Sequence, residues 1–109
     1  MMKSITGHEN LADFMTKLHT SSPKSWLLLS SALSSLLDRF LTGEITAEDL
    51  KTLADALEMN EAVVYEQPHE KMIADILFTL SNPEINESLT SSNATVLIQQ
   101  IKSASRLLE

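Results

Sequence analysis

The sequence predicts an all-α fold, a single-domain helical bundle of about five helices that spans residues 1–109. Leucine, alanine and serine dominate, while β-branched and aromatic residues are scarce, and this composition favours helices over strands. Apolar residues recur at helical spacing in five stretches. No alternating strand pattern of useful length appears, and no Asn-Gly or Asp-Gly hairpin turn. A chain of 109 residues fits one domain with one core.

The first predicted helix runs from about Glu9 to His19. Its apolar residues fall at positions i, i+3, i+4 and i+7, the spacing that places side chains on one face of a helix. These residues are Leu11, Phe14, Met15 and Leu18.

The second predicted helix runs from Pro23 to Leu41. Ser22 is expected to be its N-cap, because proline is favoured at the first helical position that follows. Gly43 is expected to end it, since glycine often lies just beyond a helix. Apolar residues cover most of its circumference, so we expect it to be the central helix. Small residues such as Ser35 form the remaining face, which we expect to be exposed, although small side chains would also let a neighbouring backbone approach.

The third predicted helix opens at Thr46. Asp49 follows three residues later, in the pattern of a capping box with aspartate in place of the usual glutamate or glutamine. Residues Asn60 to Gln67 then form a connector, which is either a short helical turn or a few extended residues. The buried stripe of the third helix consists of Leu50, Leu53, Ala54 and Leu57.

The fourth predicted helix starts near Pro68 and is ended by Pro83, because the residue before a proline avoids the α region. Glu84 to Ser91 is expected to be a loop. The last helix is expected to begin after Ser92 or Asn93 as its N-cap. The side chains expected to face inward from it are Val96, Leu97, Ile98, Ile101, Ala104, Leu107 and Leu108.

The composition also limits the compartment and the partners. The absence of cysteine excludes disulfides and thiolate metal sites and fits a reducing compartment. No secretory signal is recognisable, and the leucine-rich run from Trp26 to Leu37 is too short to span a bilayer. We therefore expect a cytoplasmic protein with no membrane partner. The net charge of −7 argues against direct binding of nucleic acid, because phosphate contacts need lysine and arginine.

The negative charge is confined to one window, Glu44 to Glu70. The window contains eight acids and one base, Lys51, while the rest of the chain contains seven acids and seven bases. Clustered charge of one sign speeds association with a partner of opposite sign, and the only tyrosine, a favoured interface residue, lies in the same window. The alternative is a solvated helix face followed by an acidic loop. The residues expected to bind a basic partner are Glu44, Glu48, Asp49, Asp55, Glu58, Glu61, Tyr65, Glu66 and Glu70.

No residue pattern predicts catalysis. The histidines His8, His19 and His69 lack a partner at the helical spacing of a metal site. Two glycines cannot make a Gly-rich phosphate loop, and the serines lie in no recognisable nucleophile turn. We therefore expect a non-enzymatic protein that uses no metal and no cofactor.

Part of the chain, from Leu41 to Asn86, resembles a known family. The similar pieces are Gly43–Thr46, Leu53–Glu58 and Asn82–Asn86. They resemble the helical immunity proteins of bacterial polymorphic-toxin systems, in particular those of contact-dependent growth inhibition. The resemblance covers somewhat under half of the chain.

This resemblance implies a protein of the producer's cytoplasm that binds the C-terminal toxin domain of a sibling cell's surface protein. Many such toxins are nucleases with basic clefts, which an acidic helical protein can fill in place of the phosphate backbone. No residue-level role carries over, because the family varies widely in sequence. The immunity proteins of the nuclease colicins are also short, acidic and helical, but their paired-tyrosine motif is absent and Tyr65 stands alone.

Two other functions remain open. The first is a helical adaptor or a self-associating structural module that uses an apolar helix face. A self-associating module would form a stable homo-oligomer whose formation is insensitive to salt. The second is a helical enzyme or metal protein, and metal analysis of the purified chain would test the metal-binding hypothesis.

Overall fold

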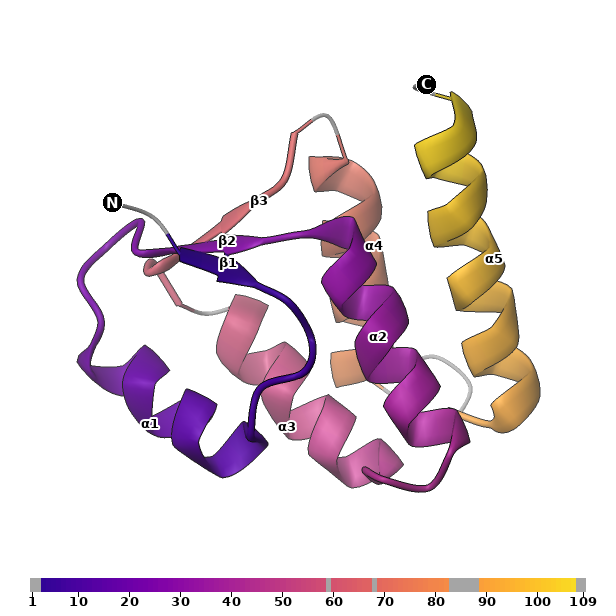
Figure 1. The fold of residues 1–109 in the computed structure, drawn as a ribbon, viewed down its shortest axis with the longest axis horizontal. Helices are drawn as coiled ribbons and strands as arrows, with labels where there is room; N and C mark the ends of the chain where they lie inside the picture. Colours follow the sequence, from indigo (N-terminus) through magenta and orange to yellow (C-terminus); the bar gives the residue numbers. More distant parts are fainter. Residues whose placement is uncertain (1–2, 59, 68, 83–88, 108–109) are drawn as a thin grey trace.

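Three short parallel strands accompany five helices in the computed structural model, which describes residues 3–58, 60–67, 69–82 and 89–107 (Figure 1). The strands form one sheet in the order β1-β2-β3, so β2 is central. The predicted helical fold with five helices is confirmed, but the fold is not purely all-α because it also contains this small sheet. The elements in chain order are β1 (Lys3–Ile5), α1 (Leu11–Thr20), β2 (Trp26–Leu28), α2 (Ser30–Leu41), α3 (Ala47–Glu58), β3 (Val63–Tyr65), α4 (Glu70–Ser81) and α5 (Ser91–Leu107).

The strand β2 lies where the sequence predicts the first turns of the second helix. Pro23 and Lys24 form a turn, in which Lys24 has a φ of 59°, and α2 begins only at Ser30. A central strand of a parallel sheet usually reads as an unbroken apolar run. Such a run cannot be distinguished from a buried helical segment by periodicity alone, so Trp26–Leu28 carries no strand signal of its own.

The two outer strands are extended segments of three residues each. The Asn60–Gln67 connector contains β3. Of the two predicted alternatives the structure shows the extended one, because Val63–Tyr65 is extended and pairs with β2. β1 pairs with the other side of β2 and has no counterpart in the predicted elements. Three residues are too few for an alternating pattern to be recognised.

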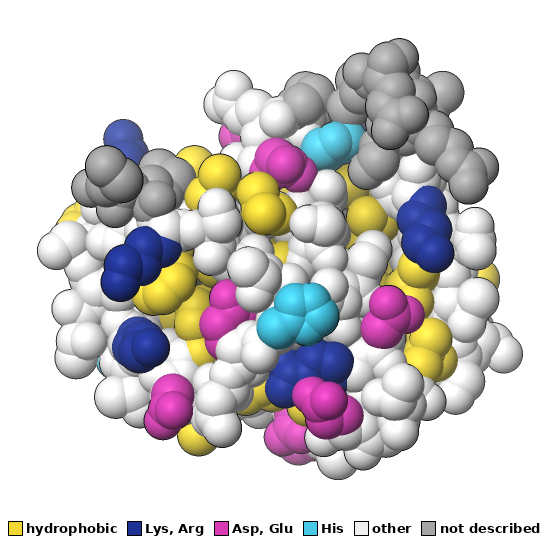
Figure 2. All heavy atoms as spheres, in the orientation of Figure 1, with side chains coloured by type: hydrophobic (Ala, Val, Ile, Leu, Met, Phe, Trp, Pro, Cys, Tyr) yellow, Lys and Arg dark blue, Asp and Glu magenta, His cyan; other side chains and the backbone are white. Residues whose placement is uncertain are grey.

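One face of the sheet is buried and the other is not. On the buried face, the rings of Trp26 and Phe14 meet edge to face, with their centroids 5.1 Å apart. Ile5 and Leu28 lie on the same face and are also buried. Figure 2 shows hydrophobic side chains at the surface in the region of the strands. The row of paired residues on the opposite face is Ser4, Leu27 and Val64, none of which is fully buried.

The helices pack in pairs around the buried side of this sheet. α3 packs chiefly against α4, and α5 chiefly against α2. One hydrophobic cluster takes residues from every helix and from β1 and β2. In the described part of the chain, no helix is long and apolar enough to cross a membrane.

Two predicted helix ends are confirmed by their hydrogen bonds. The Thr46 hydroxyl accepts from the backbone N–H of Asp49 (3.1 Å), and the Asp49 carboxylate accepts from the backbone N–H of Thr46 (2.9 Å). Beyond α2, Gly43 has a φ of 84°, and its N–H donates to the carbonyl of Phe40 (3.1 Å). This geometry is a common glycine-terminated helix end.

The other helix boundaries differ from the predictions by a few residues. α5 starts at Ser91, and the Thr90 hydroxyl accepts from the backbone N–H of Asn93 (3.2 Å), so Thr90 replaces both predicted caps. α4 ends at Ser81. Pro83 and the loop residues 84–88 lie outside the described residues.

The segment between β1 and α1 is held against α2. Arg39 donates through Nη1 to the carbonyl oxygens of Gly7 (2.9 Å) and Glu9 (3.0 Å). The Glu9 carboxylate accepts from the backbone N–H groups of Thr6 (2.8 Å) and Gly7 (2.9 Å). Burial alone would raise the pKa of Glu9, but these hydrogen bonds outweigh it and the pKa is lowered. Because Gly7 packs closely on Ser35, the serine face of α2 is covered here and not simply exposed as predicted.

Candidate functional site

The outward side of α3 carries three of the predicted partner-binding residues. We call them the α3 ridge: Glu48, Asp55 and Glu58, all exposed. Glu48 and Asp55 are seven residues apart, so they lie on the same side of the helix and about 10 Å apart along its axis. The side chains of the predicted buried stripe point the opposite way and are buried, namely Leu50, Leu53, Ala54 and Leu57.

The α3 ridge is not purely acidic. The Lys51 ammonium lies 3.4 Å from the Asp55 carboxylate, in a pair that is largely open to solvent. An exposed pair of this kind contributes about 0.3–0.5 kcal/mol to a helix, so Asp55 can exchange Lys51 for another cation. Figure 2 shows the same mixture on a larger scale, with acidic and basic side chains interspersed on the face that it presents.

Two further carboxylates of the predicted site have partners within the protein. The Asp49 carboxylate caps α3 through the backbone N–H of Thr46. The Glu44 carboxylate pairs with Arg39, the residue that also holds the N-terminal segment. Both acids are exposed, but their hydrogen bonds make them parts of the fold as well as of the surface.

The carboxylate of Glu66 caps α2, and no sequence pattern indicated this role. Its Oε1 atom accepts from the backbone N–H (3.0 Å) and from the hydroxyl (2.8 Å) of Ser30, the first residue of α2. The N-cap position is occupied by Leu29, which provides no capping side chain. A carboxylate at a helix N-terminus satisfies a free N–H and interacts favourably with the helix dipole. Glu66 therefore stabilises the fold, and its side chain is only partly exposed.

Loss of this carboxylate is expected to destabilise the fold. Glu66→Ala would leave the hydroxyl and N–H of buried Ser30 without their acceptor, at about 1–2 kcal/mol. Glu66→Gln keeps an acceptor and should lose less. The control is Glu61→Ala, an exposed neighbour with no side-chain hydrogen bond among the described contacts, expected within about 0.5 kcal/mol of the parent. Urea unfolding measures all three, and equal effects for Glu66→Ala and Glu61→Ala would contradict the capping role.

Tyr65 is half-buried on β3 and packs against the hydrophobic core. Burial raises the pKa of its hydroxyl, and the nearby Glu58 carboxylate raises it further. Tyr65 is therefore neutral at physiological pH and adds no charge to the surface. Glu58 also accepts a hydrogen bond from the Ser81 hydroxyl, so these three residues meet where α3, β3 and α4 come together.

The structure does not gather all nine predicted residues into one patch. Glu61 lies in the turn before β3, beside a shallow hollow that also involves His19 and Pro23. Glu66 follows the other end of β3. Glu70 opens α4 and is exposed. The most coherent candidate contact surface is the α3 ridge, and the remaining acids contribute to the field around the molecule.

A groove between α4 and α5 was not among the predicted features. Val96 lies in it and is 56 % exposed, although the sequence predicts it to face inward. The helical period could have indicated this, because Val96 lies about 160° from Ala94 around the helix, well off the stripe formed by buried Ala94, Ile98 and Ile101. The groove has no polar motif that a sequence pattern would reveal.

Within the described residues, no three histidine, cysteine, aspartate or glutamate side chains gather closely enough to hold a metal ion. Comparisons of the chain with protein-family models, with curated proteins and with solved structures gave no match.

Proposed function

We propose that the protein is an immunity protein that binds and neutralises a cognate toxin domain, a basic nuclease domain, through its acidic surface. The observation that carries the proposal is the α3 ridge, where Glu48 and Asp55 project from one well-packed helix and exposed Glu58, bonded to Ser81, lies at its end. The resemblance of Leu41–Asn86 to immunity proteins supports it independently. The proposal gives the protein a cytoplasmic location, no catalytic role and no cofactor.

The physical effect expected of this surface is mainly on the rate of association. The net charge of −7 lies entirely between Glu44 and Glu70, and clustered charge of this kind attracts a basic domain to that part of the surface, which raises association rates about 10- to 10³-fold at low salt. Exposed ion pairs at the rim contribute little once formed. The α3 ridge then occupies the basic cleft where the nuclease would hold phosphates.

A second candidate function is a helical adaptor. The observation that favours it is the groove between α4 and α5, which offers an apolar docking surface away from the α3 ridge. An adaptor that acted through this groove would bind its partner with little dependence on salt.

Reversal of the ridge charges tests the proposed function. The probe is the purified C-terminal domain of the surface toxin encoded beside this gene in the producing strain. Combining Glu48→Lys with Asp55→Lys should lower its association rate at least about tenfold at low salt, with a smaller difference at high salt. Stopped-flow binding measures the rates, and growth of cells that express the toxin measures protection.

The chain offers a matched control for this variant. Asp13→Lys combined with Asp38→Lys makes the same change in net charge at exposed positions, one in the first turn of α1 and one near the end of α2. We expect the control to retain most of the association rate and all of the protection. No complex and no protection by the parent protein would reject the immunity function. Equal loss in both double variants would reject the α3 ridge as the contact surface.

A further inference from the structure

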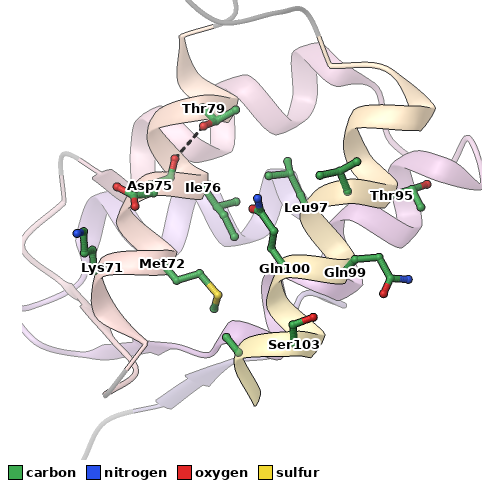
Figure 3. Close-up of a pocket in the computed structure, with 12 residues that line it drawn as sticks. Lys71, Met72, Asp75, Ile76, Thr79, Thr95, Leu97, Gln99, Gln100 and Ser103 are labelled. Carbon is green, nitrogen blue, oxygen red and sulfur yellow. Dashed lines mark hydrogen bonds between the residues drawn. The ribbon is translucent and has the colours of Figure 1, made fainter. Parts of the chain in front are cut away.

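The groove between α4 and α5 exists because each helix packs chiefly on a different neighbour. α4 lies against α3, and α5 lies against α2. The space left between them has a volume of about 1000 Å³ (Figure 3). It follows about two turns of each helix, from Lys71 to Thr79 on α4 and from Thr95 to Ala104 on α5.

The floor of the groove is apolar. Met72 and Ile76 of α4 and Leu97 of α5 point into the space between the two helices in Figure 3. Val96 adds an apolar side chain that is 56 % exposed. Ile76 (2 % exposed) and Leu97 (9 %) belong to the buried core, so the accessible apolar surface comes from Met72 and Val96, and covering it with a partner is expected to be favourable.

Among the described residues that line the groove, the charged ones lie on α4. Lys71 and Asp75 lie one helical turn apart on α4, both exposed, and no ion pair joins them within the described part of the chain. The described polar residues on the α5 side, such as Gln100 and Ser103, are uncharged. The groove therefore presents one cation, Lys71, and one anion, Asp75. They are four residues apart, the spacing at which neighbouring side chains lie on one face of a helix.

We propose that this groove binds an amphipathic helix of another protein. The helix places its apolar stripe on Met72 and Val96, above buried Ile76 and Leu97, and it carries an acidic and a basic residue one turn apart, opposite Lys71 and Asp75. Both walls are helices whose internal backbone groups are already hydrogen-bonded, so an extended segment would find few partners for its own backbone, whereas a helix satisfies its own. A second copy of this chain is disfavoured, because two molecules of net charge −7 repel each other.

This inference does not depend on the toxin-binding proposal, because the groove and the α3 ridge are different surfaces. The probe is a synthetic 18-residue amphipathic helix with glutamate and lysine four residues apart beside its apolar stripe. Two control peptides carry two lysines or two glutamates at the same positions. A peptide with its glutamate and lysine exchanged would be a poor control, because it could bind in the opposite direction and make the same two ion pairs. A peptide with two like charges cannot do so in either direction.

The measurement is a titration of the isotopically labelled full chain, followed by NMR. The mixed peptide should shift the amides of α4 and α5 and bind about fivefold more tightly than either control peptide, because each control keeps one ion pair and replaces the other with a contact between like charges. Lys71→Glu makes the charged wall doubly acidic, so this variant should prefer the two-lysine peptide. That exchange of preference would not follow from a general loss of stability.

A pair of surface substitutions tests the apolar floor. Val96→Glu should abolish peptide binding, whereas Phe78→Glu, at a 48 % exposed position of α4 outside the groove, should leave it unchanged. The proposal is overturned if the mixed peptide shifts no amides up to millimolar concentration, or if Lys71→Glu does not change the preference. Concentration-dependent shifts of the same amides without peptide would also overturn it, because they would identify a second copy as the occupant.

Discussion

Gly7→Ala is expected to destabilise the protein by about 2–5 kcal/mol, because two separate effects add at this position. Gly7 has a φ of 88°, a conformation that costs an alanine about 1–2 kcal/mol. A Cβ at Gly7 would also lie 2.5 Å from the carbonyl oxygen of Ala32 and 2.8 Å from the Cβ of Ser35. Both atoms belong to α2, so the clash cannot be relieved by a flexible side chain.

Gly43→Ala separates the two effects. Gly43 has nearly the same φ, 84°, but a Cβ there would meet nothing within 4 Å. This variant should therefore lose only the conformational contribution, about 1–2 kcal/mol. Chemical unfolding gives the free energy of unfolding of both variants. The difference between their losses is the cost of forcing a Cβ into the contact between Gly7 and α2. Equal losses would mean that Gly7 does not pack on α2 as described.

The helices could be predicted because they are amphipathic and end at recognisable residues. Four apolar residues on one face predict the position of α3, and Thr46 predicts where it begins. The strands could not be predicted, since each has three residues and their pairing joins segments far apart in the sequence. The apolar run at Trp26–Leu28 fits a buried helix as well as a buried strand, and only the pairing with Lys3–Ile5 and Val63–Tyr65 decides between them.

The candidate site shows the same division. The sequence locates the negative charge, but it does not show which carboxylates are already in use. The capping role of Asp49 is local and could be predicted from Thr46 three residues earlier. The capping role of Glu66 joins residues 36 positions apart, so no local pattern indicates it. A tertiary contact therefore engages one acid of the predicted surface, Glu66, while Glu48 and Asp55 stay exposed on α3.

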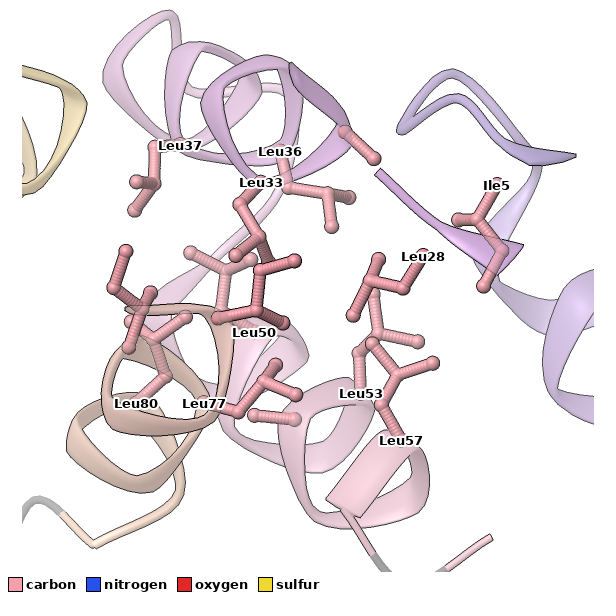
Figure 4. Packing of buried hydrophobic residues seen from close by; sticks show 14 of the residues in the cluster. Ile5, Leu28, Leu33, Leu36, Leu37, Leu50, Leu53, Leu57, Leu77 and Leu80 are labelled. Atoms are coloured by element: carbon pink, nitrogen blue, oxygen red, sulfur yellow. The ribbon is translucent and has the colours of Figure 1, made fainter. Parts of the chain in front are cut away.

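Leu28→Ala is expected to be among the most destabilising substitutions, at about 2–5 kcal/mol. Leu28 is 0 % exposed on the central strand, and it faces the side chains of α2 and α3 (Figure 4). Its removal leaves a cavity in the hydrophobic cluster that the packed helices can fill only in part. A loss of this size is a large fraction of the total stability of a small domain, about 5–15 kcal/mol.

Leu27→Ala, on the opposite face of the same strand, is the matched control. Leu27 is only partly buried, so its truncation should cost less than half as much as Leu28→Ala in urea unfolding. The comparison keeps the residue type, the strand and the substitution constant and changes only the face of the sheet. Similar losses for the two variants would mean that both faces are covered. A clear difference would establish that the helices cover one face and that the row of Ser4, Leu27 and Val64 lies at the surface.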